Sequence, residues 1–129
     1  MAAIWNEINE KLEKSPTTTS STNFAAYEFE FDYNEDTDPQ HVKLELTLPV
    51  SEAIALEKEL SKNIKEIKKS LNDLPIESVI IILKHLLVTK QPKTDATFVY
   101  RLIDNYLSAE NDMDELLSEI ENALDAIGY

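Results

Sequence analysis

The stretch YEFEFDYNEDTDPQHVKLELTL at residues 27–48 decides the fold. Aromatic residues alternate with acidic ones in its first part, and aliphatic residues alternate with polar ones from Val42 to Leu48. Because side chains two residues apart share one face of a strand, each part predicts a strand with one apolar face. Residues 34–40 between them predict a long acidic loop, and Pro49 ends the second strand. Residues 24–48 are therefore expected to form a two-stranded antiparallel β-hairpin.

A hairpin alone is barely stable in water, so its aromatic face must pack against helices. Apolar residues in steps of three and four predict a long helix that runs from Ser51, its N-cap, to about Leu71. The next helix, from about Ile76 to Thr89, is apolar nearly all round. We expect it to lie at the centre of the core.

Two further helices complete the four that are expected over residues 51–127. Thr94 is expected to cap the third of them. Asp112 and Glu115 fit a capping box that opens the fourth helix. Gly128 fits the residue that follows its C-terminus.

The chain before the hairpin divides into two segments. Residues 1–14 have the apolar spacing of an amphipathic helix, with Trp5 beside its stripe, and residues 15–23 are a hydroxyl-rich flexible connector. The expected fold class is α+β, a single domain over residues 1–129. It is a mainly helical bundle with one two-stranded antiparallel β-hairpin near the N-terminus, in the order α-β-β-α-α-α-α.

The composition of the 129 residues excludes several classes of site. Without cysteine there are no disulfides and no thiolate metal sites. Gly128 is the only glycine, and His41 and His85 are the only histidines, so glycine-rich phosphate loops and the H-E-x-x-H zinc motif are excluded. We expect a non-enzyme that needs no cofactor. The longest apolar run, at 79–83, is far below the roughly 20 residues of a membrane span, so we expect a cytoplasmic protein.

Charge is the most informative feature of this acidic protein. The 25 acidic and 12 basic residues give a net charge of -13. Residues 15–50 hold seven acids and one base, and residues 94–129 hold nine acids and one base. Residues 51–71 between them hold four acids and five lysines. Such a field attracts basic partners and repels nucleic acid and anionic membranes.

The last helix carries the most concentrated set of candidate partner-binding residues. At about 100° per residue, its carboxylates fall on the two flanks of the apolar stripe. One flank holds Asp114, Glu121 and Asp125, and the other holds Asp112, Glu115 and Glu119. Asp104 and the possible anchor Trp5 complete the set. These carboxylates fit an acidic protein-binding face, a mimic of a nucleic-acid backbone, or simply the solvated sides of a packed helix.

The function that this pattern favours is a non-catalytic binding protein for a basic protein surface. Strong acidity and a small size are typical of proteins that mask or inhibit nucleic-acid enzymes. Immunity proteins, antitoxins and phage inhibitors of host defence are of this kind. The expectation rests on physical character alone, because no motif accompanies it.

A calcium-binding regulatory protein is the first alternative function. Asp32, Asn34 and Asp36 match the D-x-[DN]-x-[DN] opening of a calcium loop, and Asp38 could add a ligand. The match ends there, because Thr37 stands where the turn requires glycine and Lys43 where a bidentate glutamate is required.

A structural subunit of a larger assembly is the second alternative. Ile81 and Val88 fall on the polar side of the helix expected at 76–89. Two apolar residues there indicate either burial, which we favour, or contact with another chain, such as a homodimer partner.

Overall fold

The computed structural model describes residues 25–129, and its hairpin has the predicted apolar face. β1 (Tyr27–Glu35) and β2 (Asp38–Leu46) are antiparallel, with Phe29 opposite Leu44 and Phe31 opposite Val42. All four of these side chains are buried. The helix expected at 1–14, with Trp5, and the connector expected at 15–23 lie outside the described residues.

The turn of the hairpin differs from the sequence prediction. The expected long acidic loop at 34–40 is wrong, because the strands continue until Glu35 faces Asp38 and only Asp36 and Thr37 remain between them. Asp36 has φ 57°, the left-handed conformation that aspartate tolerates better than most residues. Positive φ is what closes a two-residue hairpin turn without splaying the strands.

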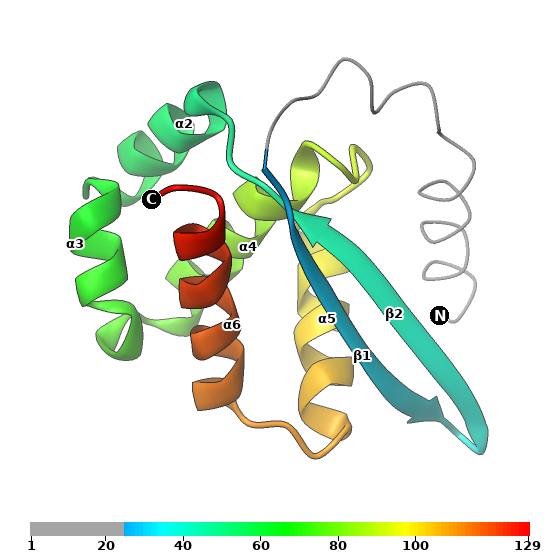
Figure 1. The fold of residues 1–129 in the computed structure, drawn as a ribbon. Helices are drawn as coiled ribbons and strands as arrows, with labels where there is room; N and C mark the ends of the chain where they lie inside the picture. The colour runs from blue at the N-terminus through cyan, green and yellow to red at the C-terminus, as the bar shows by residue number, and fades with distance from the viewer. Residues whose placement is uncertain (1–24) are drawn as a thin grey trace.

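Helices make up most of the remaining chain, so the α+β class and the element order are confirmed. They are α2 (Val50–Leu60), α3 (Ile64–Lys69), the short 3₁₀ helix η2 (Leu71–Asp73), α4 (Ile76–Val88), α5 (Ala96–Ser108) and α6 (Met113–Ala126). In Figure 1 the hairpin lies against α5 and α6, while α2 and α3 form a corner on the opposite side. None of these helices has the length and apolarity to cross a bilayer.

The single long helix expected from Ser51 to Leu71 is wrong. α2 ends at Leu60, where Ser61 adopts φ 55° and the Lys62 N–H donates to the Glu57 carbonyl at 3.2 Å. α3 then begins with a capping box. The Asn63 side chain accepts from the Glu66 N–H at 2.9 Å, and the Glu66 carboxylate accepts from the Asn63 N–H at 3.2 Å. The C-cap of α2 and the N-cap of α3 therefore replace the continuous helical hydrogen bonds that the periodicity predicted.

The other helix ends show which cap predictions hold. The capping box of Asp112 and Glu115 is confirmed, and Gly128 follows α6 with φ 102° as expected. Ser51 is not an N-cap, because α2 already begins at Val50. Thr94 is not one either. Its hydroxyl donates to the Gln91 carbonyl at 2.7 Å, and the next residue, Asp95, caps α5 by accepting from the Phe98 N–H.

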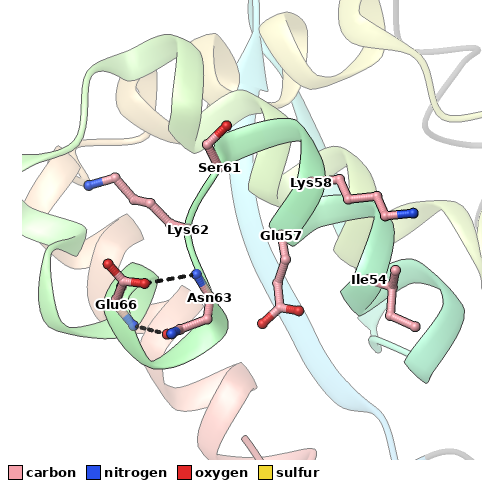
Figure 2. Close-up of a pocket in the computed structure, with 7 residues that line it drawn as sticks. All are labelled: Ile54, Glu57, Lys58, Ser61, Lys62, Asn63 and Glu66. Carbon is pink, nitrogen blue, oxygen red and sulfur yellow. Dashed lines mark hydrogen bonds between the residues drawn. The ribbon is translucent and has the colours of Figure 1, made fainter.

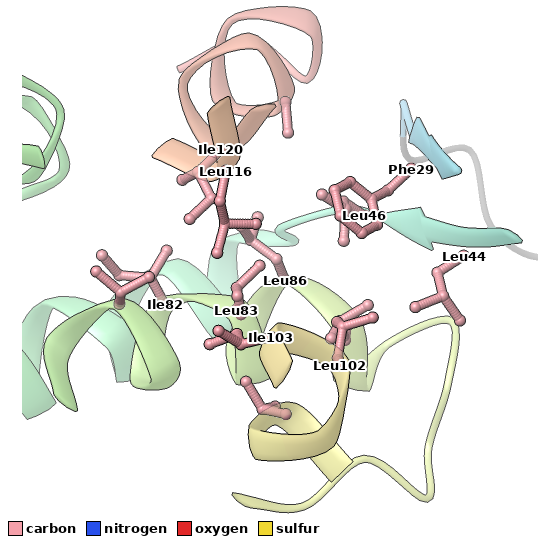
Figure 3. Close-up of a cluster of buried hydrophobic side chains, with 14 of the residues drawn as sticks. Phe29, Leu44, Leu46, Ile82, Leu83, Leu86, Leu102, Ile103, Leu116 and Ile120 are labelled. Atoms are coloured by element: carbon pink, nitrogen blue, oxygen red, sulfur yellow. The ribbon is translucent and has the colours of Figure 1, made fainter. Parts of the chain in front are cut away.

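The core lies between the aromatic face of the hairpin and α4, α5 and α6. α4 is central as predicted, with Ile82, Leu83 and Leu86 fully buried. Figure 3 shows their side chains meeting Leu116 and Ile120 of α6, with Phe29 and Leu46 approaching from the sheet. The ring of Phe29 lies 5.6 Å from that of Tyr106 on α5, and the ring of Phe31 lies 5.2 Å from it. These ring contacts fix the sheet on the helices.

One buried polar side chain joins β2 to the segment after α4. Gln91 is only 3% exposed. Its Oε1 accepts from the Glu45 N–H at 3.0 Å, and its Nε2 donates to the Glu45 carbonyl at 3.0 Å and to the Leu87 carbonyl at 2.7 Å. The edge of β2 is thus paired with a side chain, as it would be with a neighbouring strand.

Candidate functional site

The carboxylates of α6 lie on the two predicted sides of the helix, and each side faces a different element. On one side Glu119 accepts a hydrogen bond from the Tyr27 hydroxyl at the start of β1. On the other side Asp125 forms an ion pair with Lys68 of α3, whose ammonium also donates to the Tyr129 carbonyl at 2.8 Å. The apolar stripe between them, with Leu116, Ile120 and Leu124, is buried. α6 therefore presents two separate acidic flanks, one toward β1 and one toward α3.

The flank beside β1 surrounds a buried tyrosine. Burial is the main cause that raises the pKa of Tyr106 to about 12, and the charges of Glu119, Glu115 and Asp112 raise it further. The hydrogen bond to Glu119 is the main cause that raises the pKa of Tyr27 above 10.0, and burial adds to it. Glu119 contacts Tyr27 directly, and Glu115 and Asp112 add negative charge on the same flank, near Tyr106. The result is a concentrated negative field at the edge of the hairpin.

Several candidate residues also hold the fold together. Asp112 and Glu115 form the capping box of α6, Glu119 anchors Tyr27, and Asp125 anchors Lys68. Asp104 on α5 and Asp114 and Glu121 on α6 are exposed. Within residues 25–129 these last three carboxylates make no side-chain hydrogen bond or ion pair. They are the candidates whose charge is left uncompensated. Trp5 lies outside the described residues.

The outer face of the hairpin is a second acidic surface, formed by residues outside the predicted partner-binding set. The Nδ1 of His41 lies 2.6 Å from Asp32, and its Nε2 lies 2.8 Å from Glu30. Lys43 pairs with Glu28 at 2.9 Å. Acidic residues alternate along the first strand, and that alternation alone would have placed them together on one exposed face.

His41 is expected to titrate above its ordinary pKa. The hydrogen bond that the His41 ring donates to the Asp32 carboxylate is the main cause that raises the pKa of His41 above 6.5. Burial opposes it, and the hydrogen bond to Glu30 raises the pKa further. A raised folded-state pKa means that the ion pairs contribute stability below about pH 6.5, which is lost as the pH rises through the folded-state value.

An NMR titration of the His41 ring is expected to give a pKa above 6.5, and Asp32→Asn to bring it back toward 6.5. Asp38→Asn, at the start of β2 and opposite Glu35, is the control and is expected to change the pKa of His41 much less.

The residues predicted as calcium ligands do not form a cluster in this hairpin. Asp32 and Asn34 lie on the outer face of β1, Asp36 lies in the turn, and Asp38 begins β2. Asp32 is already engaged by His41. Among residues 25–129, no three His, Asp or Glu side chains are grouped as the ligands of a metal ion. A two-residue turn does not bend the chain around an ion as a twelve-residue calcium loop does.

The apolar residues considered for self-association are half-buried. Ile81 packs against the core cluster, and Val88 is partly covered. The most exposed large hydrophobic side chains of the described chain lie elsewhere, on α2, at the start of α4 and on α5. They are Val50, Ile54, Ile76 and Tyr100.

His85 joins α4 to α2. Its Nδ1 lies 2.8 Å from Glu52 and its Nε2 lies 2.7 Å from Glu59, and its side chain is only 12% exposed. Both ring nitrogens are therefore engaged by carboxylates of one neighbouring helix. The two carboxylates lie on opposite edges of the ring, so this contact holds α2 against α4.

Comparisons with protein-family models, curated proteins and solved structures find no match to this chain.

Proposed function

We propose that this protein is a small non-catalytic binding protein that masks or inhibits a basic partner protein. The observation that carries the proposal is the set of exposed, uncompensated carboxylates of Asp104, Asp114 and Glu121 in a chain of net charge -13. A nucleic-acid enzyme is the partner class we favour, since its substrate-binding surface is basic. The mode of action would then be that of immunity proteins, antitoxins and phage inhibitors, in the cytoplasm.

Acidic surfaces of this kind act mainly on the rate of encounter. Long-range attraction orients two oppositely charged proteins before they touch, and it raises the association rate more than the final affinity. The outer face of the hairpin and the flanks of α6 would both contribute to this attraction. The same net charge opposes direct binding to nucleic acid or to anionic membranes.

The engagement of His85 supports a non-catalytic role. A catalytic histidine presents one ring nitrogen to a nucleophile or a substrate. Both ring nitrogens of His85 lie against Glu52 and Glu59 of α2.

Capture of partners from a source-cell lysate tests the proposed function. The full chain is immobilised, and retained proteins are identified by mass spectrometry at low and at high salt. A basic protein that is retained at low salt and released at high salt supports the proposal, because salt screens exposed charges within about 8–10 Å. Retention that does not depend on salt would favour the structural-subunit alternative and contradict the proposal.

Charge reversal is expected to slow association with such a partner. Asp114→Lys with Glu121→Lys removes two uncompensated carboxylates without touching a cap or an ion pair, and we expect an association rate about tenfold lower at low salt. The control is Glu77→Lys, which reverses one exposed charge on α4. It is compared with the single substitution Glu121→Lys, so that both variants change the net charge equally. Surface plasmon resonance measures both rates. Equal effects of Glu77→Lys and Glu121→Lys would show that net charge alone, and no particular surface, governs binding.

A further inference from the structure

The edge of β1 that faces away from β2, here called the open edge, carries backbone groups outside the ladder. Gln91 bonds both the N–H and the carbonyl of Glu45, so these groups point away from β1. Glu45 stands opposite Glu28, and at such a position of an antiparallel ladder both residues turn their backbone groups outward. The pattern repeats at every second residue, so the N–H and carbonyl groups of Glu28, Glu30 and Asp32 face away from β2. Within residues 25–129 no hydrogen bond reaches them.

The carboxylates of the same residues are paired on one side only. Lys43 lies 2.9 Å from Glu28, and the ring of His41 lies 2.8 Å from Glu30 and 2.6 Å from Asp32. Both bases belong to β2, and in the described part of the chain they are the only ion-pair partners of these carboxylates. A strand added along the open edge would place its outer side chains beside the same carboxylates, on the side away from β2.

The flank of α6 beside β1 makes the approach to the open edge acidic from a second side. β2 and α6 lie on opposite sides of β1 in Figure 1, and Glu119 of α6 accepts the hydrogen bond of the Tyr27 hydroxyl. Tyr106, which packs against the aromatic face of β1, is within electrostatic reach of Glu119, Glu115 and Asp112. This flank therefore runs beside the strand whose backbone is open.

The lysines of the chain gather away from the open edge. α2 and α3 form a corner on the opposite side of the molecule from the hairpin (Figure 1), and Figure 2 shows Lys58 and Lys62 at a shallow pocket in that corner. Lys68 pairs with Asp125 on the other flank of α6. Arg101 is the only base of α5 and α6, and it forms no ion pair with the carboxylates of β1 or α6 within residues 25–129. The open edge therefore keeps its negative surroundings.

Like charges keep a second copy of the chain from this edge. An antiparallel pair of two β1 strands would set Glu28, Glu30 and Asp32 beside the same residues of the other copy. Like charges directly opposite one another destabilise a sheet, and charged edge strands prevent pairing between copies in this way. A strand that carries bases in the same places meets attraction instead.

We propose that the open edge of β1 pairs with an extended segment of the basic partner protein, in which lysine or arginine recurs at every second position. The backbone of that segment would bond the outward N–H and carbonyl groups of Glu28, Glu30 and Asp32 as a third strand. Its basic side chains would lie beside the carboxylates of the same residues and supply the specificity. The inference rests on the proposed function and adds to it the mode of recognition.

Amide hydrogen exchange measured by NMR on the full chain tests this pairing directly. The probe is the end-blocked peptide KTKTKTK, in which threonine favours an extended chain. The N–H groups of Glu28, Glu30 and Asp32 are expected to exchange rapidly in the free protein. With the peptide at about ten times its dissociation constant, their exchange is expected to slow about tenfold, because only the unbound protein exchanges.

The control peptide ETETETE offers the same backbone with the opposite charge, and it is expected to protect none of these amides. Equal protection by the two peptides would overturn the choice of a basic partner. Binding of KTKTKTK without protection of the three amides, or no binding of KTKTKTK at low salt, would overturn pairing at this edge.

A pair of variants separates backbone pairing from charge. Glu30→Gln and Glu30→Pro remove the same carboxylate, but only proline also removes the outward N–H. Proline is tolerated at edge positions whose N–H faces outward, and Pro39 stands at such a position in β2. Glu30→Pro is expected to weaken KTKTKTK binding about three- to tenfold more than Glu30→Gln, which corresponds to one hydrogen bond. Equal weakening in two folded variants would overturn strand pairing. If circular dichroism shows that Glu30→Pro does not fold, the exchange experiment on the parent chain decides.

Failure of this inference is distinguishable from failure of the proposed function. A basic protein that is captured from the lysate in a salt-dependent manner, but leaves the exchange of the Glu30 and Asp32 amides unchanged, would keep the proposed function and overturn the inference. Protection by KTKTKTK without capture of any basic protein would support pairing at the open edge and contradict the proposed function. Protection that rises with the concentration of the chain alone would assign the edge to a second copy and overturn the inference.

Discussion

Phe29→Ala is expected to lower the free energy of unfolding by about 3–5 kcal/mol. Phe29 is 2% exposed and is the third residue of β1, opposite Leu44. Its ring lies 5.6 Å from those of Phe31 and Tyr106. The substitution removes the transfer free energy of the ring and also leaves a cavity between the sheet and α5, which the packed helices cannot fill completely.

Chemical denaturation followed by circular dichroism measures this loss. The matched control is Tyr100→Ala on α5, since Tyr100 is an aromatic residue that is 50% exposed. It is expected to change the unfolding free energy by no more than about 0.5 kcal/mol. If Phe29→Ala cost as little as Tyr100→Ala, the hairpin would not be docked on the helices as described.

The elements that the sequence predicts best are those whose burial pattern is local. The alternation in β1 gives one buried and one exposed face directly, and the apolar composition of α4 places it at the centre of the core. The break at Ser61 is different. Apolar residues continue in helical steps from Leu60 to Ile64 and Ile67, so periodicity cannot detect it. The signal that could have found it is the N-x-x-E pattern of Asn63 and Glu66, which is a capping box.

The candidate site was predictable only as far as single helices determine it. Helical geometry predicts Glu119 and Asp125 on different sides of α6, and in the structure Glu119 contacts β1 while Asp125 contacts α3. Which carboxylates remain uncompensated depends on residues far away in the sequence. Lys68 and Asp125 are 57 residues apart, and Tyr27 and Glu119 are 92 residues apart. No local sequence pattern reveals such pairs. The sequence alone therefore does not distinguish the paired carboxylates of Glu119 and Asp125 from the carboxylate of Glu121, which is unpaired within residues 25–129.

Gln91→Leu leaves two backbone groups of Glu45 without a partner and is expected to lower the free energy of unfolding by about 2–4 kcal/mol, although leucine fills a similar volume and is more apolar. The side chain of Gln91 satisfies both the N–H and the carbonyl of Glu45. Leucine can satisfy neither, and a buried backbone group without a partner costs about 1–3 kcal/mol. The favourable burial of the leucine side chain offsets only part of that loss, because both backbone groups of Glu45 lose their hydrogen-bond partner.

Amide hydrogen exchange separates this effect from a general loss of packing. If Gln91 acts as a substitute strand, the Glu45 N–H exchanges faster in Gln91→Leu even in conditions where the whole protein remains folded, because its only hydrogen-bond acceptor in the described structure is gone. Gln40→Leu is the control: Gln40 is a half-buried glutamine in the same strand, opposite Tyr33. It is expected to leave the exchange of Glu45 unchanged. Slow exchange of the Glu45 N–H in Gln91→Leu would mean that water or another group replaces the side chain, and that the edge of β2 does not depend on it.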